Sequence, residues 1–244
     1  VDKERISPAL ANLSRQERLR LFCGLTGSRP ERWLLFGDNQ EIENSLTNYA
    51  RAANNAGFFS PFSLEYCFKS QCGWFTRGKS DFYLDAPRNF LLKRGEGNYS
   101  GQEVLAALSF LIVGVDKVES KRYPGLNIKS LWKNDVLVTQ IQSQKEIDSA
   151  SLLELKKAKW ERNLLRSAVG WAQDVGLARV LVVPAENSYW LNNNYCQQGG
   201  DNLEKRFFLR YDVTARRCGF KQEEKNSPYV LELPTKVIFD NFWK

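Results

Sequence analysis

The chain of 244 residues contains no histidine and no methionine. Without histidine it cannot form a Ser-His-Asp triad, a Cys-His pair or a histidine metal site. Any acid–base chemistry would have to come from Glu, Asp, Lys, Tyr or Cys side chains. The sequence therefore excludes the catalytic classes that depend on an imidazole.

Long apolar runs are also missing. No stretch approaches the roughly 18 residues that a membrane-spanning helix needs, and the longest, residues 104–115, is more typical of a buried strand or strand pair. Residues 1–12 are charged and lack the apolar segment of a secretory signal. We therefore expect no membrane partner and a cytoplasmic location.

Patterns that would hold a metal or a disulfide framework are not found either. The five cysteines are odd in number and match neither a CxxC nor a zinc spacing, which favours reduced thiols. A nuclease-like core would need a Glu-x-Lys on a central strand to hold magnesium. The corresponding strand here contains Gln140-Ile-Gln142, which supplies no charge for a metal. We expect no metal.

The charge is unbalanced towards basic residues. The chain has 35 Lys and Arg against 28 Asp and Glu, a formal charge of +7. This excess favours an acidic partner, such as nucleic acid, a phosphorylated cofactor or an acidic protein surface. No run of five like charges occurs, so there is no basic tail.

The order of the expected elements predicts an α/β (α+β) fold with a mixed central sheet and flanking helices. We expect residues 1–100 to form an N-terminal segment of helices and strands that packs on a core formed by residues 101–244, in one continuous domain. Apolar spacing and alternation predict helices at 40–56, 151–175 and 207–217 and strands within 102–115, 135–142, 179–183 and 229–233.

The helix at 151–175 is predicted from apolar residues at intervals of three, four and seven. Leu153, Trp160, Leu164 and Trp171 fall on one face by this count. We interpret the two tryptophans as core residues, because large aromatic side chains on an apolar stripe are usually buried.

Two segments resemble GCN5-related N-acetyltransferase (GNAT) proteins. Residues 164–183, with Leu-Leu followed by Ala-x-x-x-Gly and a strand, resemble the central helix and fifth strand of that family. Residues 211–221, which close on Gly219-Phe220, resemble its last helix. The resemblance covers roughly residues 100–234. It implies two parallel strands that splay apart, with the pantetheine of acetyl-CoA or another acyl-CoA in the gap and an amine as acceptor.

The motif that holds the pyrophosphate in GNAT proteins is altered here. Lys156 occupies the position of the first basic or Gln residue, and Lys157, Lys159 and Glu161 occupy the glycine positions. The family often has a tyrosine four residues before the closing glycine, which protonates the leaving thiolate. Ala215 occupies that position, and Tyr211 lies a full turn earlier. Tyr211 is expected to point elsewhere unless the helix rotates, so no catalytic residue is assigned.

Five residues remain as candidates for cofactor binding. Lys156, Lys157 and Lys159 either hold phosphate groups as point charges or form the solvated face of the helix. Gln140 and Gln142 share one face of a strand, which is either a polar row that binds ligand or the exposed side of a sheet. The sequence leaves both pairs of alternatives open.

Two functions follow from these observations. The first is an acyl-CoA-dependent N-acyltransferase, which the strand–helix–strand order and the Gly219-Phe220 closure favour. The alternative is a catalytically inactive GNAT-like module for binding or assembly, which the altered glycine and tyrosine positions favour. In that case the basic charge would suit a nucleic acid or an acidic protein partner.

Overall fold

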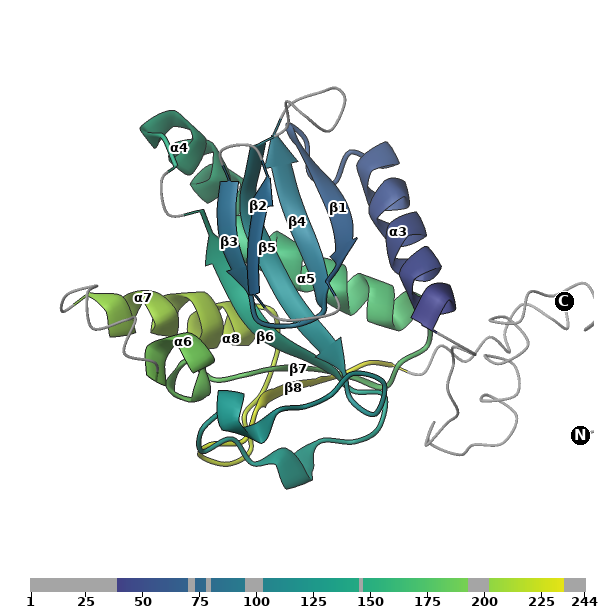
Figure 1. Cartoon of the computed structure of the whole chain (residues 1–244), viewed down its shortest axis with the longest axis vertical. Coiled ribbons are helices and arrows are strands. Elements are labelled where there is room, and N and C mark those ends of the chain that lie inside the picture. The colour runs from purple at the N-terminus through teal and green to yellow at the C-terminus, as the bar shows by residue number, and fades with distance from the viewer. Residues whose placement is uncertain are drawn as a thin grey trace, which may run out of the picture.

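The computed structural model describes residues 39–69, 73–77, 80–94, 103–144, 147–192 and 202–234 (Figure 1). The part of the predicted N-terminal segment before residue 39 lies outside these residues, and so do the last ten residues.

A six-stranded mixed sheet forms the centre of the molecule, as the element order predicted. All neighbouring strands are antiparallel except the pair β6–β7, which is parallel. Strands from both sides of residue 100 belong to this one sheet. In spatial order the strands are β1 (Phe62–Phe68), β4 (Arg88–Arg94), β5 (Glu103–Ile112), β6 (Val136–Ser143), β7 (Arg179–Val182) and β8 (Tyr229–Glu232).

Helices α3 (Asn39–Asn55) and α5 (Trp160–Asp174) cover one face of the sheet (Figure 1). Helix α3 agrees with the helix predicted at 40–56, since Leu46 and its apolar neighbours at helical spacing are buried. Trp171 of α5 is buried and donates a hydrogen bond from Nε1 to Ser45 Oγ at 3.0 Å. This face carries the main hydrophobic core, and the prediction that Trp160 and Trp171 are core residues is confirmed.

The opposite face is covered by a hairpin and a long connection. The hairpin consists of β2 (Gly73–Arg77) and β3 (Ser80–Leu84), and it lies over β5 (Figure 1). The connection between β5 and β6 contains two 3-10 turns, Ser120–Arg122 and Ile128–Ser130. A buried ion pair joins Arg179 Nε to Asp135 Oδ1 at 3.0 Å.

The prediction of one helix over 151–175 is wrong, because the chain breaks at Lys159. Helix α4 (Ser149–Ala158) ends there and α5 begins, with Lys159 in the left-handed conformation at φ 50° and ψ 46°. Asn163 Nδ2 donates to the Ala158 carbonyl at 2.8 Å, which provides a hydrogen-bond partner for a backbone carbonyl at the C-terminal end of α4. The break rotates α4, and Leu153, predicted on the buried face, is 53% exposed while Leu155 is buried.

The last helical segment is longer than predicted and is not a regular α-helix. It runs through α7 (Leu203–Phe208), a π-helical turn (Leu209–Val213) and α8 (Thr214–Arg217). Gly219 follows with φ 91°, a value that L side chains rarely adopt, and Phe220 is buried behind it. Two short elements, the 3-10 turn Ala185–Asn187 and α6 (Tyr189–Asn192), connect β7 to this segment.

Candidate functional site between strands β6 and β7

Strands β6 and β7 pair over a short distance and then separate. The parallel register joins Val136 to Val180 and ends with Val138 opposite Val182, and the Val183 amide then donates to the Val138 carbonyl at 3.0 Å. Beyond Val138, β6 continues to Ser143 while the chain after β7 turns away (Figure 1). Within the described residues, β6 therefore has a backbone edge that no strand covers from position 139 onwards.

A β-bulge lies where the separation begins. In the β5–β6 ladder, Phe110 is opposite Val138 and Ser109 is opposite Gln140, so Thr139 is an extra residue. A bulge bends its strand and redirects the side chains beside it, and bulges are over-represented next to active sites. The bulge turns both Thr139 and Gln140 towards the β2–β3 hairpin, as their hydrogen bonds show.

Tyr211, in the π-helical turn, reaches the uncovered edge of β6 from the helix side. Its phenol oxygen accepts a hydrogen bond from the Ile141 amide at 3.2 Å, and its ring stacks on Phe207 with centroids 5.7 Å apart. Burial raises the pKa of Tyr211, and the nearby charge of Asp85 raises it further. The phenol is therefore protonated at neutral pH and can act as a proton donor.

Asp85 reaches the same part of β6 from the hairpin side. The carboxyl follows directly on β3 and is buried; its Oδ1 accepts a hydrogen bond from Thr139 Oγ1 at 2.7 Å. Burial raises the pKa of Asp85 from 3.8 to about 7, although the Thr139 hydrogen bond and the charge of Arg122 act in the opposite direction. A carboxyl with a pKa near neutral is suited to accept a proton at physiological pH.

The N-terminus of α5 adds a site of positive potential near the end of β6. The Arg162 and Asn163 amides make the first intrahelical bonds, to the Lys159 carbonyl at 3.0 and 3.2 Å. The two preceding amides, of Trp160 and Glu161, lie at the positive end of the helix dipole. Burial raises the pKa of the Glu161 carboxyl. A hydrogen bond from its own backbone amide and the positive charges of Arg210, Arg162 and Lys156 lower it.

Arg210 connects this helix end to β6. Its Nη2 donates to Ser143 Oγ at 3.0 Å, and its guanidinium lies over Trp160 with Cζ 5.7 Å from the ring centroid. Burial lowers the pKa of Arg210, while Tyr211 and Glu161 raise it. An arginine remains charged under such conditions, so Arg210 places a cation between the end of β6 and the start of α5.

The structure separates the five predicted cofactor residues into two groups. Gln140 is buried, and its side chain is bonded within the protein: Nε2 donates to the Tyr83 carbonyl at 2.7 Å and to Gln142, and Oε1 accepts from Ser109 Oγ at 2.8 Å. Gln142 is half-buried beside it. Neither glutamine lies on an exposed sheet face. Whether they contact a cofactor stays a prediction.

The second group lies at the junction of α4 and α5. Lys156, Lys157 and Lys159 are exposed, as the solvated-face interpretation expects, and their proximity to the N-terminus of α5 keeps the phosphate interpretation open. Sequence reasoning did not select Asp85 or Arg210. A hint for Asp85 was present, because a carboxylate between Leu84 and Ala86 stands in an otherwise apolar stretch.

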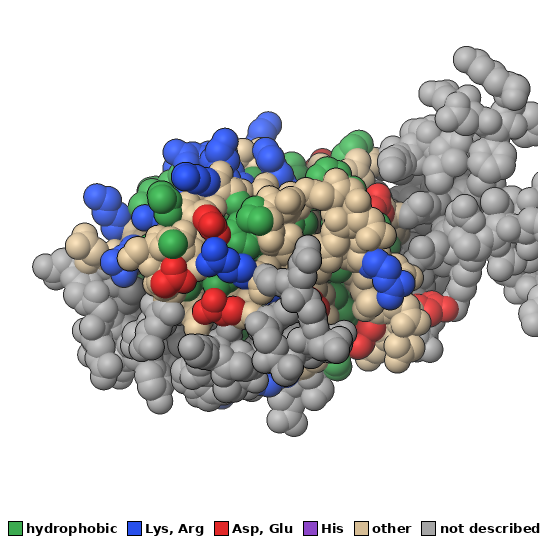
Figure 2. All heavy atoms as spheres, turned by 90° about the horizontal axis from the view of Figure 1, so that it is seen from above, with side chains coloured by type: hydrophobic (Ala, Val, Ile, Leu, Met, Phe, Trp, Pro, Cys, Tyr) green, Lys and Arg blue, Asp and Glu red, His purple; other side chains and the backbone are tan. Residues whose placement is uncertain are grey.

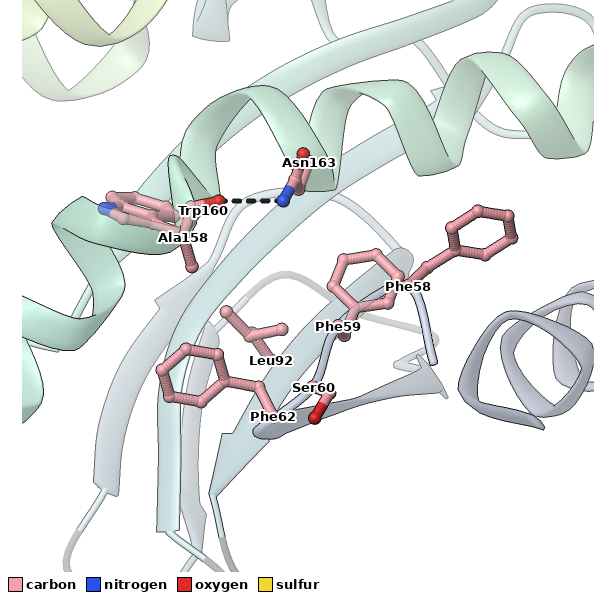
Figure 3. Close-up of a pocket in the computed structure, with 8 residues that line it drawn as sticks. All are labelled: Phe58, Phe59, Ser60, Phe62, Leu92, Ala158, Trp160 and Asn163. Carbon is pink, nitrogen blue, oxygen red and sulfur yellow. Dashed lines mark hydrogen bonds between the residues drawn. The ribbon is translucent and has the colours of Figure 1, made fainter. Parts of the chain in front are cut away.

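A small pocket lies beside the same junction, on the face covered by α3 (Figure 3). It has a volume of about 90 Å³, and Trp160 forms one wall. Its lining contains no titratable side chain. The residues are Phe58, Phe59, Ser60, Phe62, Leu92, Ala158, Trp160 and Asn163. The pocket therefore contributes no acid–base group to the site.

Over the ranges that the structure describes, no three His, Cys, Asp or Glu side chains are grouped so as to hold a metal ion. None of the helices in those ranges is long and apolar enough to cross a membrane. Comparison of the chain with protein-family models, with curated proteins and with solved structures finds no match. The resemblance to GNAT proteins therefore stays a prediction, and function is argued from the site.

Proposed function

We propose that the protein is an acyl-CoA-dependent N-acyltransferase that transfers an acyl group from a thioester to an amine. One observation carries the proposal: Asp85 and Tyr211 approach the same three residues of β6, 139–141, at the point where β6 separates from β7. One group has a pKa near neutral and the other is a protonated phenol, which is the pairing that a base and an acid require.

The residues around the gap suit the parts of an acyl-CoA. The uncovered backbone edge of β6 offers amide and carbonyl groups to pantetheine, which has two amides. The N-terminus of α5 and the cations Lys156 and Arg210 offer positive potential to the pyrophosphate. Lys159 adopts the left-handed backbone conformation that glycine favours. The altered motif therefore still has a glycine-like backbone turn directly before α5. Bound acyl-CoA would supply the activated acyl group.

The protein's own residues would manage the two protons of the transfer. As the amine nitrogen forms its bond to the acyl carbon, the Asp85 carboxylate accepts the proton that this nitrogen releases. As the carbon–sulfur bond breaks, Tyr211 donates its phenolic proton to the sulfur. Solvent exchange returns one proton to Tyr211 and removes one from Asp85, so the products are an amide and a free thiol.

The alternative, an inactive module that binds an acidic partner, is favoured by one feature of the same site. The Tyr211 hydroxyl is bonded to the Ile141 amide, a group that pantetheine would otherwise be able to use. For acyl-CoA to bind along β6, this hydrogen bond must be exchanged for one to the ligand. In an inactive module, Tyr211 would keep the gap closed.

Calorimetric titration with acetyl-CoA, followed by a thiol-release assay over a panel of primary amines, separates the two functions. We expect saturable binding and amine-dependent thiol release. Tyr211→Phe and Asp85→Asn should each lower kcat by about 100-fold or more while binding is retained. Tyr229→Phe is the matched control, because it removes a buried phenol that bonds Asp212 and Arg216 outside the gap.

Two results would contradict the proposal. An absence of binding at millimolar acetyl-CoA would reject the cofactor. Binding without thiol release, unchanged by Tyr211→Phe, would support the inactive module instead.

A further inference from the structure

The basic charge of the protein is concentrated on the helices that surround the start of α5. Residues 149–174 and 203–217, which form α4, α5, α7, the π-helical turn and α8, contain ten Lys and Arg against five Asp and Glu. This excess of five accounts for most of the net charge of +7. Figure 2 shows lysine and arginine side chains gathered on one side of the molecule, with hydrophobic side chains among them.

These ten cations form no close ion pair within the described part of the protein. Six other cations, in β4, β7 and the β5–β6 connection, each lie within 4 Å of a carboxylate; they are Arg88, Lys93, Arg94, Lys117, Arg122 and Arg179. Among the residues described, none of the ten helical cations has such a partner. The exposed members of this set, among them Arg166, Arg206 and Arg216, can therefore attract an external anion.

Four of the arginines extend beyond the proposed cofactor site. Arg162 and Arg166 lie one turn apart on α5, and both are close enough to Cys218, at the end of α8, to act on its thiol. Arg206, on α7, is close enough to Arg210 for its charge to lower the pKa of that guanidinium. Arg216 lies on α8. We call Arg162, Arg166, Arg206 and Arg216, together with Phe208, the basic surface.

The composition of the basic surface indicates which kind of anion it suits. Arginine binds phosphate through a planar fork of donors, which lysine lacks. Side chains one turn apart have Cβ atoms about 5–6 Å apart, which is close to the spacing of successive phosphates along a single strand. Phe208 is 43% exposed, and the Arg216 guanidinium lies over its ring at 5.4 Å. An exposed ring with an arginine on it is a platform on which an unpaired base can stack.

We infer that the basic surface binds single-stranded nucleic acid, with Arg162, Arg166 and Arg206 on phosphates and Phe208 against a base. This function goes beyond acyl transfer and uses neither Asp85 nor Tyr211. An anionic membrane is less well matched. Among the described side chains of α5, α7, the π-helical turn and α8, Phe208 and Leu209 are the exposed large hydrophobic residues, whereas membrane-binding helices present a continuous apolar face.

Fluorescence anisotropy with a labelled single-stranded RNA of about 20 nucleotides tests the inference. We expect binding that weakens as KCl rises from about 50 to about 300 mM, with a log–log slope near −2 for three phosphate contacts. Arg162→Glu combined with Arg166→Glu should weaken binding by at least about tenfold, and Phe208→Ala by about fivefold or more. Arg162→Gln with Arg166→Gln is the milder pair, should the reversals disturb folding.

The matched control is Lys129→Glu combined with Lys225→Glu. It makes the same change in net charge at two exposed lysines outside the four helices, Lys129 in the 3-10 turn Ile128–Ser130 and Lys225 before β8. We expect the control to weaken RNA binding by less than about threefold. An equal loss in the control would mean that only net charge matters, and would overturn the inference.

Two further experiments, a calorimetric measurement and a competition with vesicles, complete the test. Acetyl-CoA binding, measured by calorimetry, should be little changed by Arg166→Glu alone, because this residue lies one turn beyond the first turn of α5. An equal loss of RNA and acetyl-CoA binding in this variant would assign Arg166 to the cofactor and overturn the inference. Vesicles of phosphatidylcholine and phosphatidylserine should not displace the RNA. Strong vesicle binding that depends on Phe208, with RNA displaced, would identify a membrane surface instead.

Discussion

Replacing Asp85 by asparagine should make the protein more stable above neutral pH. The carboxyl is buried, and its pKa rises from 3.8 to about 7 in the folded protein. The folded state therefore binds this proton more tightly than the unfolded chain does. The associated stability is fully present below about pH 4 and is lost as pH rises through about 7. A shift of about three units corresponds to about 4 kcal/mol, at 1.36 kcal/mol per unit.

Asparagine keeps the oxygen that accepts the Thr139 hydrogen bond but cannot ionise. We expect Asp85→Asn and the wild type to have similar free energies of unfolding near pH 4, and the variant to be more stable by about 4 kcal/mol near pH 8. Urea unfolding followed by circular dichroism at intervals between these values measures the difference. Asp174→Asn makes the same chemical change at an exposed carboxyl of α5 and serves as the matched control.

If the free energies of unfolding of Asp85→Asn and the wild type change in parallel with pH, the reasoning is refuted. Such a result would show that Asp85 titrates alike in the folded and unfolded states. If the profiles diverge as expected, the ionised carboxylate destabilises the fold above neutral pH. Residues that lower stability in this way are characteristic of functional sites. A variant that is more stable and also inactive would support the role of Asp85 as the base.

Three further substitutions test the packing. Lys159→Gly should stabilise the protein by up to about 1 kcal/mol in thermal unfolding. Glycine removes the steric strain of a side chain in the left-handed conformation, and the greater entropy of glycine in the unfolded chain offsets part of this gain. Asp116→Asn should destabilise it by about 3–5 kcal/mol in urea, because Arg88, fully buried and bonded to Asp116 at 2.8 Å, would lose its counter-charge. Gln140→Leu should cost at least about 2 kcal/mol by the same assay, because it leaves buried groups on Ser109 and β3 unpaired.

Local patterns were sufficient to predict most of the sheet and the first described helix. Strand β6 alternates clearly, and α3 has a regular apolar stripe, so both were predicted within two residues of their ends. The break at Lys159 could not be predicted in this way. Trp160 and Leu164 continue an apparent stripe from Leu153, and the periodicity gives no sign that one residue between them leaves the helical conformation.

The candidate site was only partly predictable, because its parts are distant in the sequence. Gln140 was selected because of its strand, yet its side chain donates to the carbonyl of Tyr83, in a hairpin 57 residues away in the sequence. The burial that shifts the pKa of Asp85 has the same origin: its partner Thr139 is 54 residues away, and the two meet because of the bulge in β6. No local pattern reports such a contact.

Tyr211 lies one helical turn before the position at which the GNAT resemblance leads us to expect a tyrosine. The GNAT resemblance places a tyrosine at position 215, but Ala215 is fully buried and its carbonyl accepts from the Phe220 amide at 3.1 Å, within the helix closure. Tyr211, one turn earlier, lies in the π-helical turn, and π-helical turns occur frequently at functional sites. Its hydroxyl contacts Ile141, two residues after the extra residue in β6. The phenol and the bulge thus meet at one place on β6, the place that Asp85 reaches from the hairpin side, so a proton donor there does not require a tyrosine at position 215.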